Sequence, residues 1–144
     1  SSSLPLLSRV VEINGEKYLD GGITDSIPIK KSIEDNHRKN VVILTRDKTY
    51  RKKKSSFSPI FKLKYRKYPN LVNAIENRYK MYNNTLDFIE EKVKTGEVFV
   101  IQPKEPVHIS RVEKDKTKLK ELYDKGYNDA KECYEDLIKF IKEK

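Results

Sequence analysis

The sequence has few residues that form disulfides or bind zinc: one cysteine and two histidines among 144 residues. Cys133 alone cannot close a disulfide within the chain, which favours a reducing, cytoplasmic compartment. One thiol and two imidazoles also argue against a zinc site, and we expect no metal or other cofactor. No apolar run reaches the roughly 20 residues that span a bilayer. These scarcities argue against a disulfide-stapled, zinc-dependent or membrane-spanning protein.

The positive charge of the chain lies in one segment. The net charge is +9, and residues 46–67 contain ten basic residues and one acidic residue, Asp47. The remaining residues are neutral as a group, with equal numbers of basic and acidic side chains. We therefore interpret the chain as a neutral protein that carries a basic insert at 46–67.

The basic insert has three interpretations. One helical face carries apolar side chains: Phe57, Ile60, Phe61 and Tyr65. A basic amphipathic helix is typical of a membrane-surface element, in which each cation near an anionic bilayer contributes about 1 kcal/mol. The candidate membrane-surface cations are Arg51, Lys52, Lys53, Lys54, Lys62 and Lys64. A solvated loop followed by an ordinary core-facing helix is the more common form of such a run. Nucleic-acid binding is the third interpretation, and no recognised DNA- or RNA-binding motif accompanies it.

The first third of the chain predicts a hairpin, a short helix and a strand. Asn14-Gly15 favours a two-residue turn between strands at 10–13 and 16–19. Pro28 is expected to open a helix that reaches about Asp35. The apolar run at 41–44 is typical of a strand covered on both faces. Strand, helix and strand in this order indicate a crossover unit in a layered α/β fold.

The later part of the chain predicts long amphipathic helices around one strand. From Pro69, apolar residues recur every three or four positions up to a stop at Gly96. Residues 97–101 predict a buried strand. A last helical region is expected from about Asp115 to the end, with Gly126 as its break or kink, and its apolar stripe is Leu119, Leu122, Tyr123, Tyr127, Ala130, Leu137, Ile138 and Ile141.

Several segments, taken in order, resemble the C-terminal half of bacterial patatin-like phospholipases. The segments are Ser2-Ser3-Leu4-Pro5, Asn14-Gly15, Tyr18-Leu19-Asp20-Gly21-Gly22-Ile23, Asp25, Ile27-Pro28-Ile29, Tyr82-Asn83, residues 96–103 and residues 122–127. The resemblance covers nearly the whole chain. It implies the C-terminal part of a layered α/β/α fold, spanning 1–144, with the basic insert at 46–67. Residues 68–144 would then form a helical C-terminal region with one strand near 97–101.

The resemblance also implies a lipid acyl hydrolase that works by a Ser-Asp dyad. In that family the serine sits on a Gly-x-Ser-x-Gly turn, and a glycine-rich loop supplies the oxyanion hole; both precede the aspartate. This chain has neither motif, and its five glycines form no such loop. We therefore expect an N-terminal portion with the nucleophilic serine to precede this chain in a longer protein. The 144-residue chain alone is expected to be inactive.

Asp20 is the residue to which the resemblance assigns the catalytic role, with Gly21 and Gly22 as supporting residues. Weak serine nucleophiles need a positioned base, and a carboxylate at a strand end can be one. Two glycines suggest a backbone conformation that other residues would resist. The alternative is an aspartate that caps the turn or the next helix.

The other candidate residues have structural interpretations. Asp25 is expected to cap the helix near Pro28. His37 and His108 could complete a Ser-His-Asp triad with Asp20, but surface histidines are more common and a dyad does not need them. Ser1, Ser2 and Ser3 lack a glycine elbow. Cys133 is expected to be inert packing beside the apolar stripe.

Together these patterns predict the Asp-bearing part of a patatin-like acyl hydrolase. The expected substrate is a lipid or another acyl ester, with possible peripheral contact with an anionic membrane at its inner face. The alternative is a non-catalytic basic module that binds a membrane surface or nucleic acid. A part of a layered sheet exposes strand edges and an apolar face, so we also expect the isolated chain to self-associate.

Overall fold

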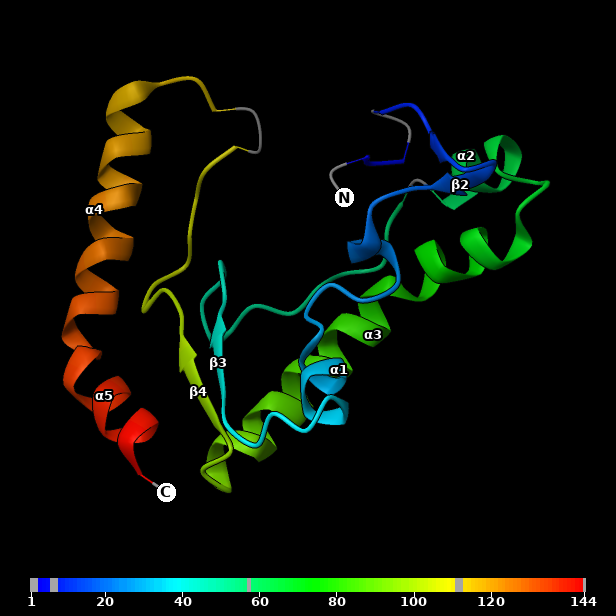
Figure 1. Cartoon of the computed structure of the whole chain (residues 1–144). Helices are drawn as coiled ribbons and strands as arrows, with labels where there is room; N and C mark the ends of the chain where they lie inside the picture. Colours follow the sequence, from blue (N-terminus) through cyan, green and yellow to red (C-terminus); the bar gives the residue numbers. More distant parts are fainter. Residues whose placement is uncertain (1–2, 6–7, 57, 111–112, 144) are drawn as a thin grey trace. The chain divides into compact units, whose positions relative to one another are not determined.

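The computed structural model describes residues 3–5, 8–56, 58–110 and 113–143. The chain forms two compact units (Figure 1). The first comprises residues 1–28 and 51–87, and the second comprises residues 29–50 and 88–144. The described part of the chain contains several helices and two small two-stranded sheets, which is a mixed α/β composition. None of the described helices has the length and apolar character needed to cross a bilayer.

A hairpin begins the first unit, as the sequence predicts. Strands β1 (Val11–Ile13) and β2 (Glu16–Tyr18) pair antiparallel. The turn residues Asn14 and Gly15 have φ of 53° and 81°, the left-handed values that a tight hairpin turn requires. A single 3₁₀ turn, η1 (Gly21–Ile23), follows the hairpin.

The first unit also contains helix α2 and most of helix α3. Helix α2 spans Ser58–Lys64, and α3 spans Pro69–Lys94. The residues of α3 up to Asp87 belong to the first unit and the later ones to the second. Both predicted ends of this long helix are confirmed. At its C-terminal end Gly96 has φ of 72°, and the N–H of Glu97 donates to the Lys92 carbonyl.

The second unit contains a parallel pair of strands. Helix α1 (Ile29–Glu34) precedes β3 (Asn40–Ile43), and β3 pairs with β4 (Val98–Ile101). The predicted crossover between the hairpin strand 16–19 and the strand 41–44 is therefore wrong. All three residues of β2 are exposed, and two of them are charged, so β2 has none of the apolar faces that a parallel strand buries.

Strand β3 is buried on one face only, which corrects the expectation of cover on both faces. Asn40 and Val42 are buried, and the Ser32 hydroxyl of α1 donates to the Asn40 side chain. On the opposite face Val41 is 42% exposed and Ile43 is 73% exposed. Helix α5 (Tyr134–Lys142) brings Phe140 to the strand next to β3 and leaves much of this face open.

The final helical region is two helices, α4 (Lys116–Glu132) and α5, seen at the left of Figure 1. The break lies at Cys133, whose ψ of 6° leaves the helical range, and not at Gly126. The Asp115 carboxylate caps α4 by accepting from the Thr117 N–H at 2.9 Å. The predicted apolar stripe is only partly covered, because α4 has no buried residue among those described.

Candidate functional site

Asp20 lies where the hairpin ends and the chain turns into η1. Its backbone N–H donates to the Ser3 carbonyl at 3.0 Å, which holds the residue in an extended conformation. Its Oδ1 accepts from the Gly22 N–H at 2.7 Å and so caps η1. The carboxylate is half-buried. The capping arrangement, one of the two sequence interpretations, is therefore present; it fixes one oxygen and leaves Oδ2 without a hydrogen bond to any described residue.

The two glycines after Asp20 do not adopt the glycine-only backbone conformation that the sequence suggested. Neither has a positive φ, so the prediction that both need a glycine-only backbone is wrong. Gly22 provides space for the carboxylate, because a Cβ there would lie 2.9 Å from Asp20 Oδ1 and this side chain would have to shift. A Cβ on Gly21 would meet nothing within 4 Å. The close approach of the Gly22 backbone is what allows its N–H to hold the carboxylate.

A cavity of about 360 Å³ opens beside Asp20, entirely within the first unit. This volume lies in the usual range for small-molecule pockets. The lining residues come from the hairpin, η1, the end of α2 and the start of α3: Val10, Lys17, Leu19, Asp20, Gly21, Ile23, Thr24, Tyr65, Tyr68, Asn70, Leu71 and Ala74. Most of these side chains are apolar or aromatic, so the cavity offers an apolar chamber next to the carboxylate.

Two polar residues of this cavity were missed in the sequence. Lys17 Nζ donates to Tyr68 Oη at 3.2 Å, and this hydrogen bond raises the pKa of Lys17 above its ordinary value. Lys17 lies two positions before Leu19, so strand alternation places both on the face that lines the cavity. That spacing was a usable signal. Tyr68 is distant from Lys17 in the sequence, and no sequence pattern indicated that it would line this cavity.

Arg78 is a second neighbour of the Asp20 turn that the sequence did not indicate. Its Nη2 lies 3.5 Å from the position of a Cβ on Gly22, and its Nε donates to Ser26 Oγ at 3.4 Å. Ser26 Oγ in turn donates to the Gly22 carbonyl at 2.7 Å. Arg78 is therefore linked, through Ser26, to the loop that carries Asp20, and it brings positive charge near the carboxylate.

The first part of the basic insert is attached to α3. The Asn83 amide accepts from the Lys52 N–H at 2.8 Å and donates to the Lys52 carbonyl at 3.1 Å. Arg51 pairs with Asp87 at 3.2 Å. Lys53 and Lys54 are exposed. The segment around Lys52 is therefore a mostly exposed loop, as one interpretation predicts, and the Lys52 backbone attaches it to α3.

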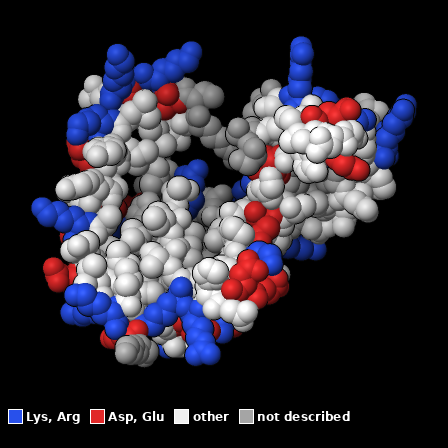
Figure 2. All heavy atoms as spheres, viewed as in Figure 1, with Lys and Arg blue, Asp and Glu red and all other residues white. Residues whose placement is uncertain are grey.

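The second part of the insert is helical, as expected, and exposes part of its apolar face. On the predicted face Tyr65 is 5% exposed and Ile60 is 51% exposed, and Leu63, which was not assigned to that face, is 74% exposed. Lys62 pairs with Glu76 of α3 at 3.0 Å, and Lys64 lies over the Tyr65 ring. Phe57 lies outside the described residues. Around α2, in the upper right of Figure 2, acidic side chains accompany the basic ones.

The remaining polar candidates have structural partners or lie at the surface. Asp25 accepts from the Ile27 N–H at 3.2 Å, so its role is structural, as expected, but this donor precedes α1 and Asp25 closes a turn instead of capping that helix. His37 and His108 are exposed, which agrees with the surface interpretation. Cys133 Sγ contacts the Ala130 carbonyl at 3.3 Å. Ser3 Oγ donates to the Arg9 carbonyl, while Ser1 and Ser2 lie outside the described residues. No metal-binding cluster occurs among the residues that the structure describes.

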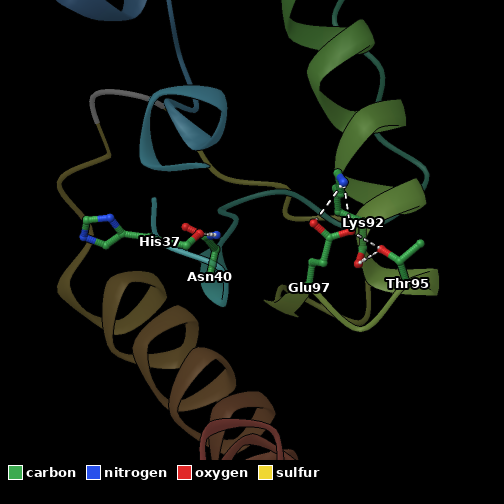
Figure 3. Close-up of polar contacts among 5 residues, drawn as sticks. All are labelled: His37, Asn40, Lys92, Thr95 and Glu97. Atoms are coloured by element: carbon green, nitrogen blue, oxygen red, sulfur yellow. Dashed lines mark hydrogen bonds and ion pairs between the residues drawn. The ribbon is translucent and has the colours of Figure 1, made fainter. Parts of the chain in front are cut away.

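A polar cluster in the second unit stabilises the turn from α3 to β4 (Figure 3). Lys92 Nζ contacts both carboxylate oxygens of Glu97, at 2.8 and 2.9 Å, and Thr95 Oγ1 donates to Glu97 Oε1 at 2.7 Å. The hydrogen bond from Lys92 lowers the pKa of Glu97, and Thr95 adds to it. In the same view Asn40 donates to the backbone carbonyl of His37 at 2.9 Å. These contacts provide hydrogen-bond partners for polar groups in the turn from α3 to β4 and at the start of β3.

Comparison with known proteins gives a family match in the later part of the chain. Residues 68–142 match the model of DUF6363, described as a domain of unknown function. Over 110 residues the chain is 31% identical to the uncharacterized protein YjjU of Escherichia coli (strain K12). That match covers 75% of this chain and 31% of the relative, so the chain spans less than a third of that protein. No solved structure matches the chain.

Proposed function

The chain belongs to the DUF6363 family, and we propose that it supplies the catalytic aspartate of a lipid acyl hydrolase. The family description assigns no activity. Asp20 also precedes the matched residues 68–142, so the proposal rests on the motifs around Asp20 and on the geometry there. The observation that carries it is a half-buried carboxylate, fixed through one oxygen, beside an apolar cavity.

In the proposed reaction Asp20 is the base for a serine in the preceding part of a longer, patatin-like protein. The serine hydroxyl gives its proton to Asp20 while its oxygen bonds to the ester carbonyl carbon. The alcohol then leaves with that proton, and an acyl-enzyme remains. Water attacks the acyl-enzyme, Asp20 takes a proton from it, and the proton passes to the departing serine oxygen. No cofactor enters either step.

The local geometry suits this role. The Gly22 N–H at 2.7 Å from Oδ1 fixes the orientation of the carboxylate. Oδ2, which no described residue engages, would face the serine hydroxyl. The apolar cavity beside Asp20 would shelter the acyl part of the substrate from water. The oxyanion donors, like the serine, would come from the preceding part of the protein.

The test uses the longest reading frame that encodes this chain. We expect the full protein to hydrolyse a fluorescent acyl ester and to react with a fluorophosphonate at one serine. Asp20→Asn should lower turnover about a hundredfold or more, the usual loss on removing a general base. Asp25→Asn is the matched control, since that carboxylate only caps a nearby turn, and it should stay near wild type.

Two results would contradict the proposal. One is a full protein whose ester turnover is unchanged by Asp20→Asn. The other is fluorophosphonate labelling of the 144-residue chain itself, because the chain has no Gly-x-Ser-x-Gly turn.

A second candidate function is attachment to an anionic membrane surface. The observation in its favour is the exposed pair Ile60 and Leu63, at 51% and 74%, next to Lys62 and Lys64 on α2. Apolar side chains among cations suit the interface of an anionic bilayer. This would place the protein at the inner face of the cytoplasmic membrane. Nucleic acid is a weaker partner, because Arg51 is already paired with Asp87.

Vesicle sedimentation tests the membrane candidate. The 144-residue chain should sediment with anionic vesicles and not with neutral ones, and Leu63→Asp should reduce binding. Lys118→Asp changes the charge further toward negative at an exposed residue of α4, in the second unit, so it is the control. Equal binding of both variants, or no binding to anionic vesicles, would remove this candidate.

A further inference from the structure

The cavity beside Asp20 has a cationic rim and an apolar interior. Lys17 and Tyr68, both exposed side chains, form the rim through their 3.2 Å hydrogen bond. Inside, Ile23 and Tyr65 are buried. This division of polar and apolar groups is the complement of an amphiphile, a molecule with a charged head and an apolar tail.

The apolar wall is built by residues that their local structure holds in place. Leu71 and Ala74 lie three positions apart on α3, so they share one face of that helix. Leu19 faces them from the end of the hairpin, and Tyr65 from the segment after α2. Ala74 is the smallest of these side chains and leaves room for a ligand. The volume of about 360 Å³ suits one alkyl chain better than two.

The rim offers donors to an anion. Lys17 uses one N–H toward Tyr68 Oη, and an ammonium has three. Tyr68 accepts this bond, so its own hydroxyl hydrogen points to another acceptor. The Lys17 ammonium is charged at neutral pH because its ordinary pKa of 10.5 is well above 7, and the hydrogen bond to Tyr68 raises this pKa further. An anionic group at the rim would therefore receive donors from both residues.

Asp20 determines which way such a ligand enters. Its carboxylate also lines the cavity, and like charges repel, so Asp20 disfavours an anionic head at that wall, although the nearby Arg78 reduces the repulsion. Lys17 supplies the only cationic side chain among the lining residues of this described cavity. The head group would therefore bind at the rim, and the tail would enter the chamber.

We propose that this cavity binds a single-chain lipid with an anionic head group, held by Lys17 and Tyr68. As the identity of a substrate or product this rests on the proposed acyl hydrolase, whereas the binding itself is a property of the 144-residue chain. The head group is a carboxylate, as in a fatty acid, or a phosphate, as in a lysophospholipid. Both present the charged oxygens that an ammonium and a phenol hydroxyl recognise.

The experiment measures binding of four lipids, each below its micelle concentration, by titration calorimetry with the 144-residue chain. Dodecanoate and a dodecanoyl lysophosphatidic acid carry anionic heads and distinguish the two sources. The corresponding monoacylglycerol is uncharged, and the lysophosphatidylcholine is zwitterionic. We expect saturable one-to-one binding of at least one anionic lipid, about tenfold tighter than the uncharged one, as one charge-assisted hydrogen bond provides.

Three variants and one control locate the site. Lys17→Met should weaken the anionic lipid about tenfold and leave the uncharged lipid unchanged. Lys80→Met removes the same charge from an α3 residue outside the cavity lining and should have no effect. Ala74→Leu should weaken all of the lipids, since it fills the chamber. Asp20→Asn should tighten the binding of the anionic lipid, since it removes a charge that repels the head group. Circular dichroism verifies the helix content of each variant.

Each outcome decides the inference. Absence of saturable binding, equal effects of Lys17→Met and Lys80→Met, or no effect of Ala74→Leu would overturn it. If lipid binds as expected but the full protein does not hydrolyse esters, the inference stands and the proposed enzyme fails. If the full protein hydrolyses esters but Lys17→Met leaves anionic-lipid binding unchanged, the proposed enzyme stands and the inference about the lipid site fails.

Discussion

Gly22→Ala is expected to destabilise the protein through Asp20, while Gly21→Ala is not. A methyl group on Gly22 would lie 2.9 Å from Asp20 Oδ1, closer than real Cβ contacts. The carboxylate, the movable end of the Asp20 side chain, would have to shift, and we expect the shift to weaken the 2.7 Å hydrogen bond from the Gly22 N–H. A lost cap of this kind costs about 1 kcal/mol. With an unfolding entropy of about 2.1 cal/mol/K per residue, the 144-residue chain would lose about 3 °C in Tm.

The steric cause can be isolated with a double-mutant cycle. In Asp20→Ala the side chain that would clash is absent, so adding Gly22→Ala should cost almost nothing. The two changes should therefore be strongly non-additive, with a coupling of about 1 kcal/mol. Gly21→Ala meets no atom within 4 Å and has no positive φ, so it should be neutral or stabilise by up to about 0.5 kcal/mol.

Thermal and urea unfolding, followed by circular dichroism, measure all four variants. Additive losses for Asp20→Ala and Gly22→Ala would refute the contact between the Gly22 Cβ and Asp20. So would equal losses for Gly21→Ala and Gly22→Ala. The same variants in the full protein would then tell whether the position of the carboxylate, and not only its presence, affects ester turnover.

Three further predictions follow from other features. Lys92 lowers the pKa of Glu97, so their ion pair stabilises the fold at pH values above the ordinary carboxyl pKa of 4.5. This stabilisation is lost as the pH falls below that value. Glu97→Gln should therefore make Tm decline less steeply when Tm is measured over a series of acidic pH values. Gly96→Ala forces a left-handed φ of 72° on alanine and should cost about 1 kcal/mol in urea unfolding, whereas no change would show that the turn relaxes. Ile43→Lys should abolish concentration-dependent association in light scattering, because it charges the exposed face of β3, and a wild-type chain that stays monomeric would refute this.

Local features were predictable because their causes lie within a few residues. Asn14-Gly15 carries the left-handed conformations of its own turn, and Gly96 those of the end of α3. The turn at Asp25 is also local, because its carboxylate accepts from the Ile27 N–H two residues later. Each of these depends on one or two backbone angles and one nearby donor, and the residue type alone reports them.

Features that depend on distant packing were not predictable. The apolar run at 41–44 looked two-sided, but its sequence could not tell that α5 would leave Ile43 exposed. Gly126 was the obvious helix breaker, yet it lies within α4, and that helix ends instead at Cys133. A glycine lowers helix propensity without requiring a break.

The candidate site also combines local features that the sequence predicts with distant contacts that it does not. Asp20 was found through its motif, and its capping contact is local. The cavity beside it is not local, because Lys17 meets Tyr68 across 51 positions of sequence. Gly22 was selected for the wrong physical reason: the constraint is the space beside the Asp20 carboxylate and not the sign of φ.

The Lys52 backbone in the insert is held to α3 by the side-chain amide of one residue, Asn83. Asn83 accepts from the Lys52 N–H and donates to the Lys52 carbonyl, the pair of bonds that a neighbouring strand would make. Deamidation of Asn83 to aspartate would turn the donor into a second acceptor, and that oxygen would then face the carbonyl of Lys52. A stored sample that gains one dalton at this residue should therefore release the insert, and the earliest sign of ageing would be faster tryptic cleavage after Lys52.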